Sequence, residues 1–176
     1  MAGLDWLNRA AFEAAEAALL RCCGCVRWAR AVASARPFGS VEALHCAAEA
    51  EWESASRDEI LEAFAHHPRI GDRASLRDRF PSTHAWSASE QAEAAVAEEK
   101  VLDDLAQGNR DYEARFGHIF IVCASGRTAA EMLALLRARV DNDPEIELKI
   151  AALEQMKITR LRLEKLLREY DAAAGV

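Results

Sequence analysis

The sequence predicts an all-α fold, a single-domain bundle of about seven to nine helices. Composition gives the first indication: alanine is abundant, whereas the 176 residues include only 8 Gly and 4 Pro, a balance that favours helices. Segments with helical spacing of apolar residues recur along the chain, most of them after a capping residue. A chain of this length can bury one core, so we expect one domain over residues 1–176, with its core from about residue 5 to residue 170.

Capping residues predict the helices of the N-terminal half. Asn8 precedes the helical pattern of residues 9–20, and Ser40 precedes that of residues 41–52. Both side chains can accept a hydrogen bond from an unpaired amide of the first turn. A shorter helix is expected from about Asp58 to His66.

Three further helices are predicted in the C-terminal half. Ser87 precedes a long helical run that reaches about Gln107, and Thr128 with Glu131 forms a capping box before residues 129–140. Asp143 is followed by a proline at the first helical position, which opens a helix to about Tyr170.

Two segments do not fit a helix. Residues 67–86 form a polar loop of about 20 residues, and loops of that length are often functional. Residues 118–125, "HIFIVCAS", are apolar and rich in β-branched and aromatic side chains, but no second run could pair with them as a strand. We therefore expect one short buried extended segment near residues 119–124.

Charge and cysteine content restrict the class of protein. A formal charge of -7 offers no excess of cations for a phosphate backbone, so a nucleic-acid partner is not expected. Acidic residues interrupt the N-terminal segment and no run is long enough to cross a bilayer, so we expect a cytoplasmic protein with no membrane partner. The five cysteines are then expected to be reduced.

A metal site is one alternative for part of those cysteines. Cys22 and Cys25 have C-x-x-C spacing, and His45 with Cys46 would complete four ligands. No second C-x-x-C is present, and small buried thiols are common, so the sequence favours reduced core cysteines without metal.

The adjacent histidines in "AHHPRI" are not equivalent. Proline disfavours helical backbone for the residue before it, so His67 must leave the helix while His66 can remain in its last turn. His66 then has a structural explanation at the negative end of the helix dipole. His67 stands at the start of the long loop, a position open to either a structural or a chemical role.

Two other groups are candidates for chemistry. Glu90 lies at the far end of the loop, although a capping box with Ser87 would also explain it. Arg160 has Glu164 at i+4, which predicts a surface pair, whereas Arg162 has no acid within reach along its helix. Arg162 therefore needs a partner elsewhere, an anionic ligand or water.

Phosphate-binding glycine loops, H-E-x-x-H and G-x-S-x-G are absent from the sequence. What remains is a site of His, Glu and Arg that works without a cofactor.

The motifs "FAHHPRIGD", "WSASEQ", "RFGHIFIVCASGRTAAEML" and "NDPEIELKIAALEQMKITRLRLEKLL", with "ARPF" before them, occur in this order. Together they closely resemble the 2-oxo-4-hydroxy-4-carboxy-5-ureidoimidazoline (OHCU) decarboxylases of urate degradation, over nearly the whole chain. The resemblance implies an all-helical, cofactor-independent lyase, usually a homodimer, whose small-molecule substrate OHCU is converted to (S)-allantoin and CO2. The alternatives are a non-catalytic helical interaction module and a Cys/His metal-binding helical protein.

The resemblance also implies roles for particular residues. The family's catalytic residues fall on His67, Glu90 and Arg162. Many members have F-G-F-P-F where this chain has F-G-H-I-F, so His118 receives no role, and none is transferred to the cysteines of "RCCGCVRW". The substrate-binding positions fall on Pro68, Ser87, Ala88, Ser89, Gln91, Phe120, Ile121, Val122, Cys123 and Ala124.

Overall fold

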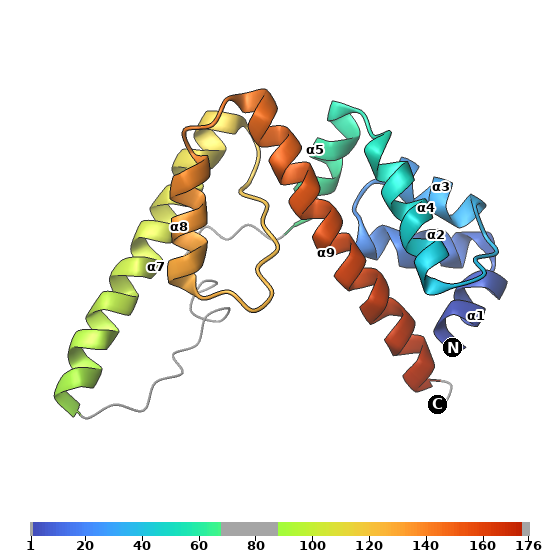
Figure 1. The fold of residues 1–176 in the computed structure, drawn as a ribbon, viewed down its shortest axis with the longest axis horizontal. Helices are drawn as coiled ribbons and strands as arrows, with labels where there is room; N and C mark the ends of the chain where they lie inside the picture. The colour runs from blue at the N-terminus through green and yellow to red at the C-terminus, as the bar shows by residue number, and fades with distance from the viewer. Residues whose placement is uncertain (1, 68–87, 174–176) are drawn as a thin grey trace. The chain divides into compact units, whose positions relative to one another are not determined.

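The computed structural model describes residues 2–67 and 88–173, without the side chains of residues 88–97. These residues form eight α-helices and no strand (Figure 1), which confirms the predicted all-α class. The chain packs as two compact units. The first comprises Met1–His67, Ile121–Cys123 and Ala151–Val176, and the second comprises Pro68–Phe120 and Ala124–Ile150. The single domain expected from the sequence stays a prediction.

The first unit contains five consecutive helices and most of the last helix. Its N-terminal helix lies directly against the C-terminal one: a Cβ on Gly3 would lie 2.1 Å from the Leu167 carbonyl oxygen. The Trp6 and Tyr170 rings stack at 3.4 Å between centroids. The helices are α1 (Ala2–Arg9), α2 (Phe12–Cys22), α3 (Val26–Ser34), α4 (Val41–Glu53), α5 (Arg57–Ala65) and α9 (Pro144–Ala173).

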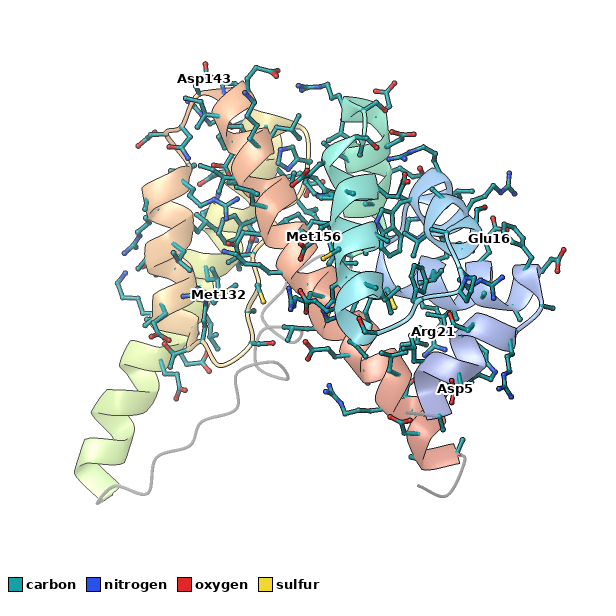
Figure 2. All side chains as sticks on the ribbon, turned by 45° about the vertical axis from the view of Figure 1, so that its right-hand side comes forward. Asp5, Glu16, Arg21, Met132, Asp143 and Met156 are labelled. Carbon is teal, nitrogen blue, oxygen red and sulfur yellow. The ribbon has the colours of Figure 1, made fainter. Side chains whose placement is uncertain are left out.

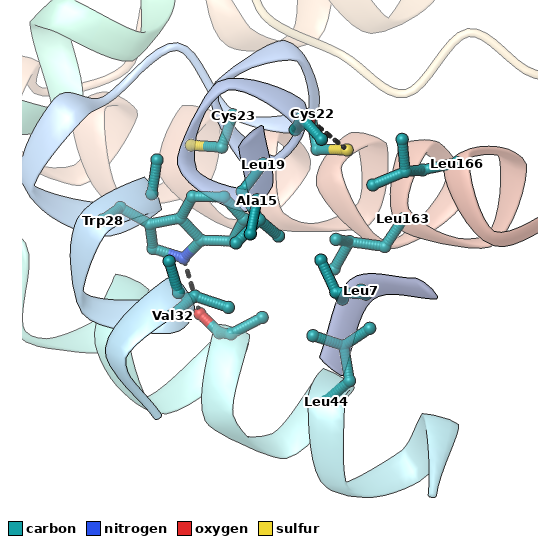
Figure 3. Packing of buried hydrophobic residues seen from close by; sticks show 14 of the residues in the cluster. Leu7, Ala15, Leu19, Cys22, Cys23, Trp28, Val32, Leu44, Leu163 and Leu166 are labelled. Carbon is teal, nitrogen blue, oxygen red and sulfur yellow. Dashed lines mark hydrogen bonds between the residues drawn. The ribbon is translucent and has the colours of Figure 1, made fainter. Parts of the chain in front are cut away.

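The core of this unit gathers apolar side chains from α1 to α5 and from α9, and Figure 3 shows part of it. Trp28 is fully buried there, and its indole N–H donates to the Ala48 carbonyl at 2.8 Å. The polar end of this large side chain is thereby satisfied. Other fully buried members are Leu7, Ala15, Leu19, Cys23, Cys25, Ala29, Val32, Leu44, Ala48, Ala63 and Leu163.

The first helix boundaries differ from the prediction. Asn8 lies inside α1 and does not cap α2, whose N-cap residue is Ala11. Its amide side chain pairs with the backbone of Phe38, donating to the carbonyl at 2.9 Å and accepting from the N–H at 2.8 Å. Helix α3 was not predicted, because its cap is Cys25, whose sulfur accepts from the Trp28 N–H at 3.4 Å.

The second unit pairs α7 (Ala88–Phe116) with α8 (Ala129–Arg139), which lie side by side (Figure 1). Helix α7 continues past the predicted end at Gln107 through Gly108, where an added Cβ would lie 2.7 Å from Leu136 Cδ2. The capping box of Thr128 and Glu131 before α8 is confirmed.

The start of α9 is also as predicted. The Asp143 carboxylate accepts from the N–H groups of Glu145 at 2.9 Å and Ile146 at 3.2 Å, and Figure 2 shows it at the first turn of the helix. Ser40 likewise caps α4 by accepting from the Ala43 N–H. Local capping chemistry therefore fixes both of these helix starts.

Residues 119–124 have no regular secondary structure, and Phe120, Ile121 and Val122 are buried. The prediction of a short buried extended segment is confirmed. Among the residues that the structure describes, no helix combines the length and apolar character needed to cross a membrane.

Candidate active site

The two histidines follow the end of α5, as the proline predicts. The helix begins with a capping box of Ser56 and Glu59 and ends at Ala65, with His66 as its C-cap residue in helical backbone geometry. His66 packs against Gly24, where an added Cβ would lie 2.3 Å from the His66 Cβ. The close contact with Gly24 indicates a structural role for His66. The next residue, His67, lies outside the helix.

His67 contacts α9 through a buried amide. Its Nε2 lies 2.6 Å from Gln155 Oε1, and Gln155 Nε2 donates to Thr159 Oγ1 at 3.1 Å. Gln155 and Thr159 are almost completely inaccessible to solvent. The ring of His67 is therefore oriented by a side chain of the last helix, Gln155.

The preceding residue of α9 holds the extended segment. The Glu154 carboxylate accepts from the Cys123 backbone N–H at 2.8 Å, and it forms an ion pair with Lys157. Ile121 and Val122, which precede Cys123, are buried. The hydrogen bond therefore holds the backbone at the end of an apolar segment. Adjacent residues of one helix thus hold His67 and Cys123.

Arg162 finds its partner on another helix, as its lack of a local acid indicated. Its Nη1 donates to the Cys22 carbonyl at 3.3 Å, at the C-terminal end of α2. A cavity of about 170 Å³ lies beside it. Its lining holds three cations and one acid, Glu169, which pairs with Arg21 at 3.0 Å. The lining residues are Arg21, Cys22, Arg162, Lys165, Leu166 and Glu169.

Positive charge therefore prevails around this cavity, which suits an anionic group of a ligand. Gln155, Thr159 and Arg162 are spaced i, i+4 and i+7, so they lie on one face of α9. With a rise of about 1.5 Å per residue, Gln155 and Arg162 are about 10 Å apart along the helix axis. The His67 contact and the guanidinium thus belong to one face of a single helix.

Arg160 does not form the predicted pair with Glu164. Its guanidinium reaches α4 instead, at 3.3 Å from Glu49 and 3.5 Å from Glu42. Glu164 pairs with Arg168 at 3.8 Å. The prediction was wrong because acids on a neighbouring helix compete with the acid one turn away.

The cysteines do not assemble a metal site in the described part of the chain. No group of three or more His, Cys, Asp or Glu side chains there could hold a metal ion. Burial raises the pKa of the Cys22 and Cys23 thiols to about 12, so both stay protonated at neutral pH, and Cys46 is exposed. These thiols behave as core side chains, which disfavours the metal-binding alternative.

Phe120 is held by the second unit through a buried ion pair. Glu147 is completely buried and accepts from Arg139 Nε at 2.8 Å, from Asn142 Nδ2 at 2.7 Å and from the Tyr112 hydroxyl. The Arg139 guanidinium lies 4.7 Å from the centre of the Phe120 ring. Burial and the neighbouring Glu147 carboxylate raise the pKa of Tyr112, so its phenol stays a donor.

The remaining predicted site residues fall outside the described residues. Pro68 and Ser87 lie in the range 68–87, and α7 begins at Ala88, but the side chains of Ala88, Ser89, Glu90 and Gln91 are outside the description. Their assigned roles, like those of His67, Arg162 and residues 120–124, stay predictions. Gln155 and Thr159 share a helix face with Arg162, but their neutral side chains carry no sequence signal of a contact with His67.

Comparison with known proteins adds an independent finding. A family model described as OHCU decarboxylase matches residues 8–164. The uric acid degradation bifunctional protein TTL of Arabidopsis thaliana is 42% identical over 153 residues, which cover 84% of this chain and 46% of that protein. The 2-oxo-4-hydroxy-4-carboxy-5-ureidoimidazoline decarboxylase of Mus musculus is 31% identical over 154 residues, covering 86% of this chain and 85% of the mouse protein.

The uric acid degradation bifunctional protein PucL of Bacillus subtilis is 30% identical over 139 residues, which cover 27% of that protein. The chain therefore spans less than half the length of TTL and of PucL. Among solved structures, an OHCU decarboxylase in the presence of (S)-allantoin matches with a TM-score of 0.68 at 39% identity. The match covers 85% of this chain and 96% of that one. An (S)-allantoin synthase matches at 19% identity with a TM-score of 0.66, which supports the fold alone.

Proposed function

The chain belongs to the OHCU decarboxylase family, and from this membership we propose that it is a carboxy-lyase of urate degradation that converts OHCU to (S)-allantoin and CO2. The observation that carries the proposal is the arrangement along α9. Gln155 contacts His67, and Arg162, on the same face, lines a cationic cavity. A proton-transfer group and an anion-binding group are the two functions that this reaction needs from a protein.

The substrate can supply its own electron sink. The carbon of OHCU that loses CO2 adjoins a ring C=N bond. When the C–C bond to the carboxylate breaks, its electron pair forms a C=C bond, and the C=N pair moves to nitrogen, which takes a proton. The resulting enol gains a proton on the ring carbon and loses its hydroxyl proton, which gives the ketone. No cofactor is required to stabilise a carbanion in this sequence.

We assign His67 as the general acid-base. An imidazole exchanges protons near neutral pH, and transfer from one side of the ring would set the (S) configuration. Glu90 would orient His67 or share the hydroxyl proton. Arg162 and Gln91 would hold the polar substituents of the ring. The carboxylate would face the apolar segment of residues 120–124, where poor solvation of its charge favours loss as neutral CO2.

The direct test is to generate OHCU in situ from urate and follow the circular dichroism of the product. Rapid appearance of one allantoin enantiomer is expected only when the protein is present. The variant His67→Asn is expected to lose on the order of 10²- to 10⁴-fold in turnover with its fold intact. His66→Asn is the matched control and should keep most of the activity, since His66 caps α5.

Two outcomes would contradict the proposal. Near-normal turnover by His67→Asn would remove His67 from the reaction. A folded wild-type protein without any effect on the enantiomer would instead favour the alternative of a non-catalytic helical module.

We further propose that the chain acts as a homodimer in the cytoplasm, with residues 5–170 as one OHCU decarboxylase-like domain. This proposal rests on the family resemblance and on the match over residues 8–164. Sedimentation equilibrium would test the homodimer, since a monomer at micromolar concentration would contradict it.

A further inference from the structure

Glu154 of α9 anchors the main chain of the buried extended segment. One oxygen of its carboxylate accepts from the Cys123 backbone N–H at 2.8 Å, and the other oxygen pairs with Lys157. A hydrogen bond from an amide to a carboxylate is roughly twice as strong as one between neutral groups. The Glu154 side chain is only 13% exposed, so little water competes for the carboxylate. The backbone at Cys123 is therefore held firmly against the last helix.

The residue before Cys123 has an unpaired backbone. Val122 is 7% exposed, and within the described ranges neither its N–H nor its carbonyl has a hydrogen-bond partner. Backbone groups of buried residues are nearly always paired. Because neighbouring residues of an extended backbone direct their N–H and C=O groups to opposite sides, those of Val122 point away from Glu154. A donor and an acceptor side by side suit a ligand group that also carries both.

We propose that Glu154 is a positioning residue for substrate binding, which holds Cys123 so that the backbone N–H and carbonyl of Val122 lie where they bind the ureido group of OHCU. The inference rests on the proposed function, in which residues 120–124 contact the substrate. It adds the side chain that fixes this segment and the backbone groups that bind.

His67 is held by the same turn of α9. Gln155, the residue after Glu154, has its Oε1 2.6 Å from His67 Nε2. Consecutive residues of a helix are about 1.5 Å apart along its axis and about 100° apart around it, so the two side chains reach different segments. The last helix therefore sets the position of the Val122 backbone through Glu154 and that of the imidazole through Gln155. Loss of the Glu154 contact is expected to weaken substrate binding and to leave the imidazole in place.

Two variants of Glu154 separate position from charge. Glu154→Asp keeps the charge but shortens the side chain by one methylene, so the carboxylate is withdrawn from the Cys123 N–H. Glu154→Gln loses the charge but keeps an acceptor oxygen at the same reach. With OHCU generated in situ, we expect KM to rise on the order of 10-fold in Glu154→Asp, the size of one lost hydrogen bond to a charged group. Its kcat should stay within about threefold, and Glu154→Gln should keep both constants within about threefold.

Lys157→Gln is the matched control on α9. Lys157 is 61% exposed, and exposed ion pairs contribute little, so this variant should keep the KM of the wild type. An equal rise of KM in Lys157→Gln and Glu154→Asp would assign the effect to the ion pair and contradict the inference. So would a higher KM in Glu154→Gln together with an unchanged KM in Glu154→Asp, because charge would then matter and position would not.

Hydrogen exchange measures the anchor without any substrate. The Cys123 N–H is expected to exchange about tenfold faster in Glu154→Asp than in the wild type, and to stay close to the wild-type rate in Glu154→Gln. The amide of Trp28, in the core of the first unit, should keep its rate in all variants, which shows that they are folded. Unchanged exchange at Cys123 in folded Glu154→Asp would overturn the inference.

A titration of the wild type with (S)-allantoin tests the backbone groups directly and depends on no variant. The compound keeps the ureido group, so the Val122 N–H signal of ¹⁵N-labelled protein is expected to shift on binding. A response elsewhere in the protein without a shift at Val122 would overturn the inference. An inactive wild type that also fails to respond to (S)-allantoin would instead contradict the proposed function, and the inference with it.

Discussion

Glu147 offers the largest predicted effect on stability. Its carboxylate is completely buried and accepts from Arg139, Asn142 and Tyr112. Glu147→Ala would remove a buried carboxylate that pairs with the Arg139 guanidinium, and Arg139 is only 8% exposed. Removing one partner of a buried ion pair typically costs about 3–5 kcal/mol. The Tyr112 hydroxyl would lose its acceptor too, which adds about 1–3 kcal/mol for a buried donor.

These two losses are not additive, because the emptied site can admit a water molecule that serves both groups. The Phe120 ring, 4.7 Å from the guanidinium, also retains about 0.5–2 kcal/mol of attraction for the charge. We therefore expect Glu147→Ala to lower the free energy of unfolding by about 4 kcal/mol. That is a large part of the roughly 5–15 kcal/mol that stabilises a domain.

Urea unfolding followed by far-ultraviolet circular dichroism would measure the change, with the slope against denaturant unaltered. Arg137→Ala is the matched control on α8. Arg137 is 63% exposed and pairs with Asp104 at 3.0 Å, and exposed pairs of this kind contribute about 1 kcal/mol at most. A loss below about 1 kcal/mol in Glu147→Ala, or an equal loss in the two variants, would refute the reasoning.

Two further predictions concern pH and thiol chemistry. Burial, with the nearby Arg160, lowers the pKa of His45, whose ring nitrogens have no hydrogen-bond partner in the described structure. In the unfolded chain this histidine has a pKa of about 6.5, so the unfolded state binds a proton at His45 more readily than the folded state does. The free energy of unfolding should therefore fall as the pH drops below about 6.5, and this fall should be smaller in His45→Leu. Identical pH dependence of urea unfolding in the two proteins would contradict this. At pH 8 a thiol reagent should modify the exposed Cys46 in the native protein. Three buried thiols should react only after unfolding, namely Cys22, Cys23 and Cys25. Mass-spectrometric mapping would check it, and rapid native labelling of Cys23 would be the contrary result.

Helix starts were predictable where the decisive contact is local. Ser40, Thr128 and Asp143 each cap a helix through a bond to an amide within three residues, which a sequence reveals directly. Asn8 has the same capping chemistry, but its partner is Phe38, 30 residues away. Gly108 inside α7 likewise faces a residue far away in the sequence, because an added Cβ would lie 2.7 Å from Leu136 Cδ2.

The site shows the same division between local and distant contacts. Proline after His67 separated the two histidines because its steric effect acts on the neighbouring residue. The lack of a local acid also indicated that Arg162 has a partner elsewhere, which is the Cys22 carbonyl. Gln155 gave no comparable signal, because a neutral polar residue on a long helix is ordinary until its contact with His67 is known.

The neutral charge of Gln155 is itself informative about the proposed reaction. A carboxylate at 2.6 Å from the imidazole would orient it equally well, but it would stabilise the imidazolium and raise the pKa of His67. An acid-base group that must both give and take a proton works best when neither form is strongly favoured at the working pH. An amide supplies the orientation without the charge, and Thr159, which accepts from the Gln155 amide nitrogen, is also uncharged. Gln155 therefore adds no formal charge beside the imidazole, which leaves the substrate's own charge able to influence the protonation of His67.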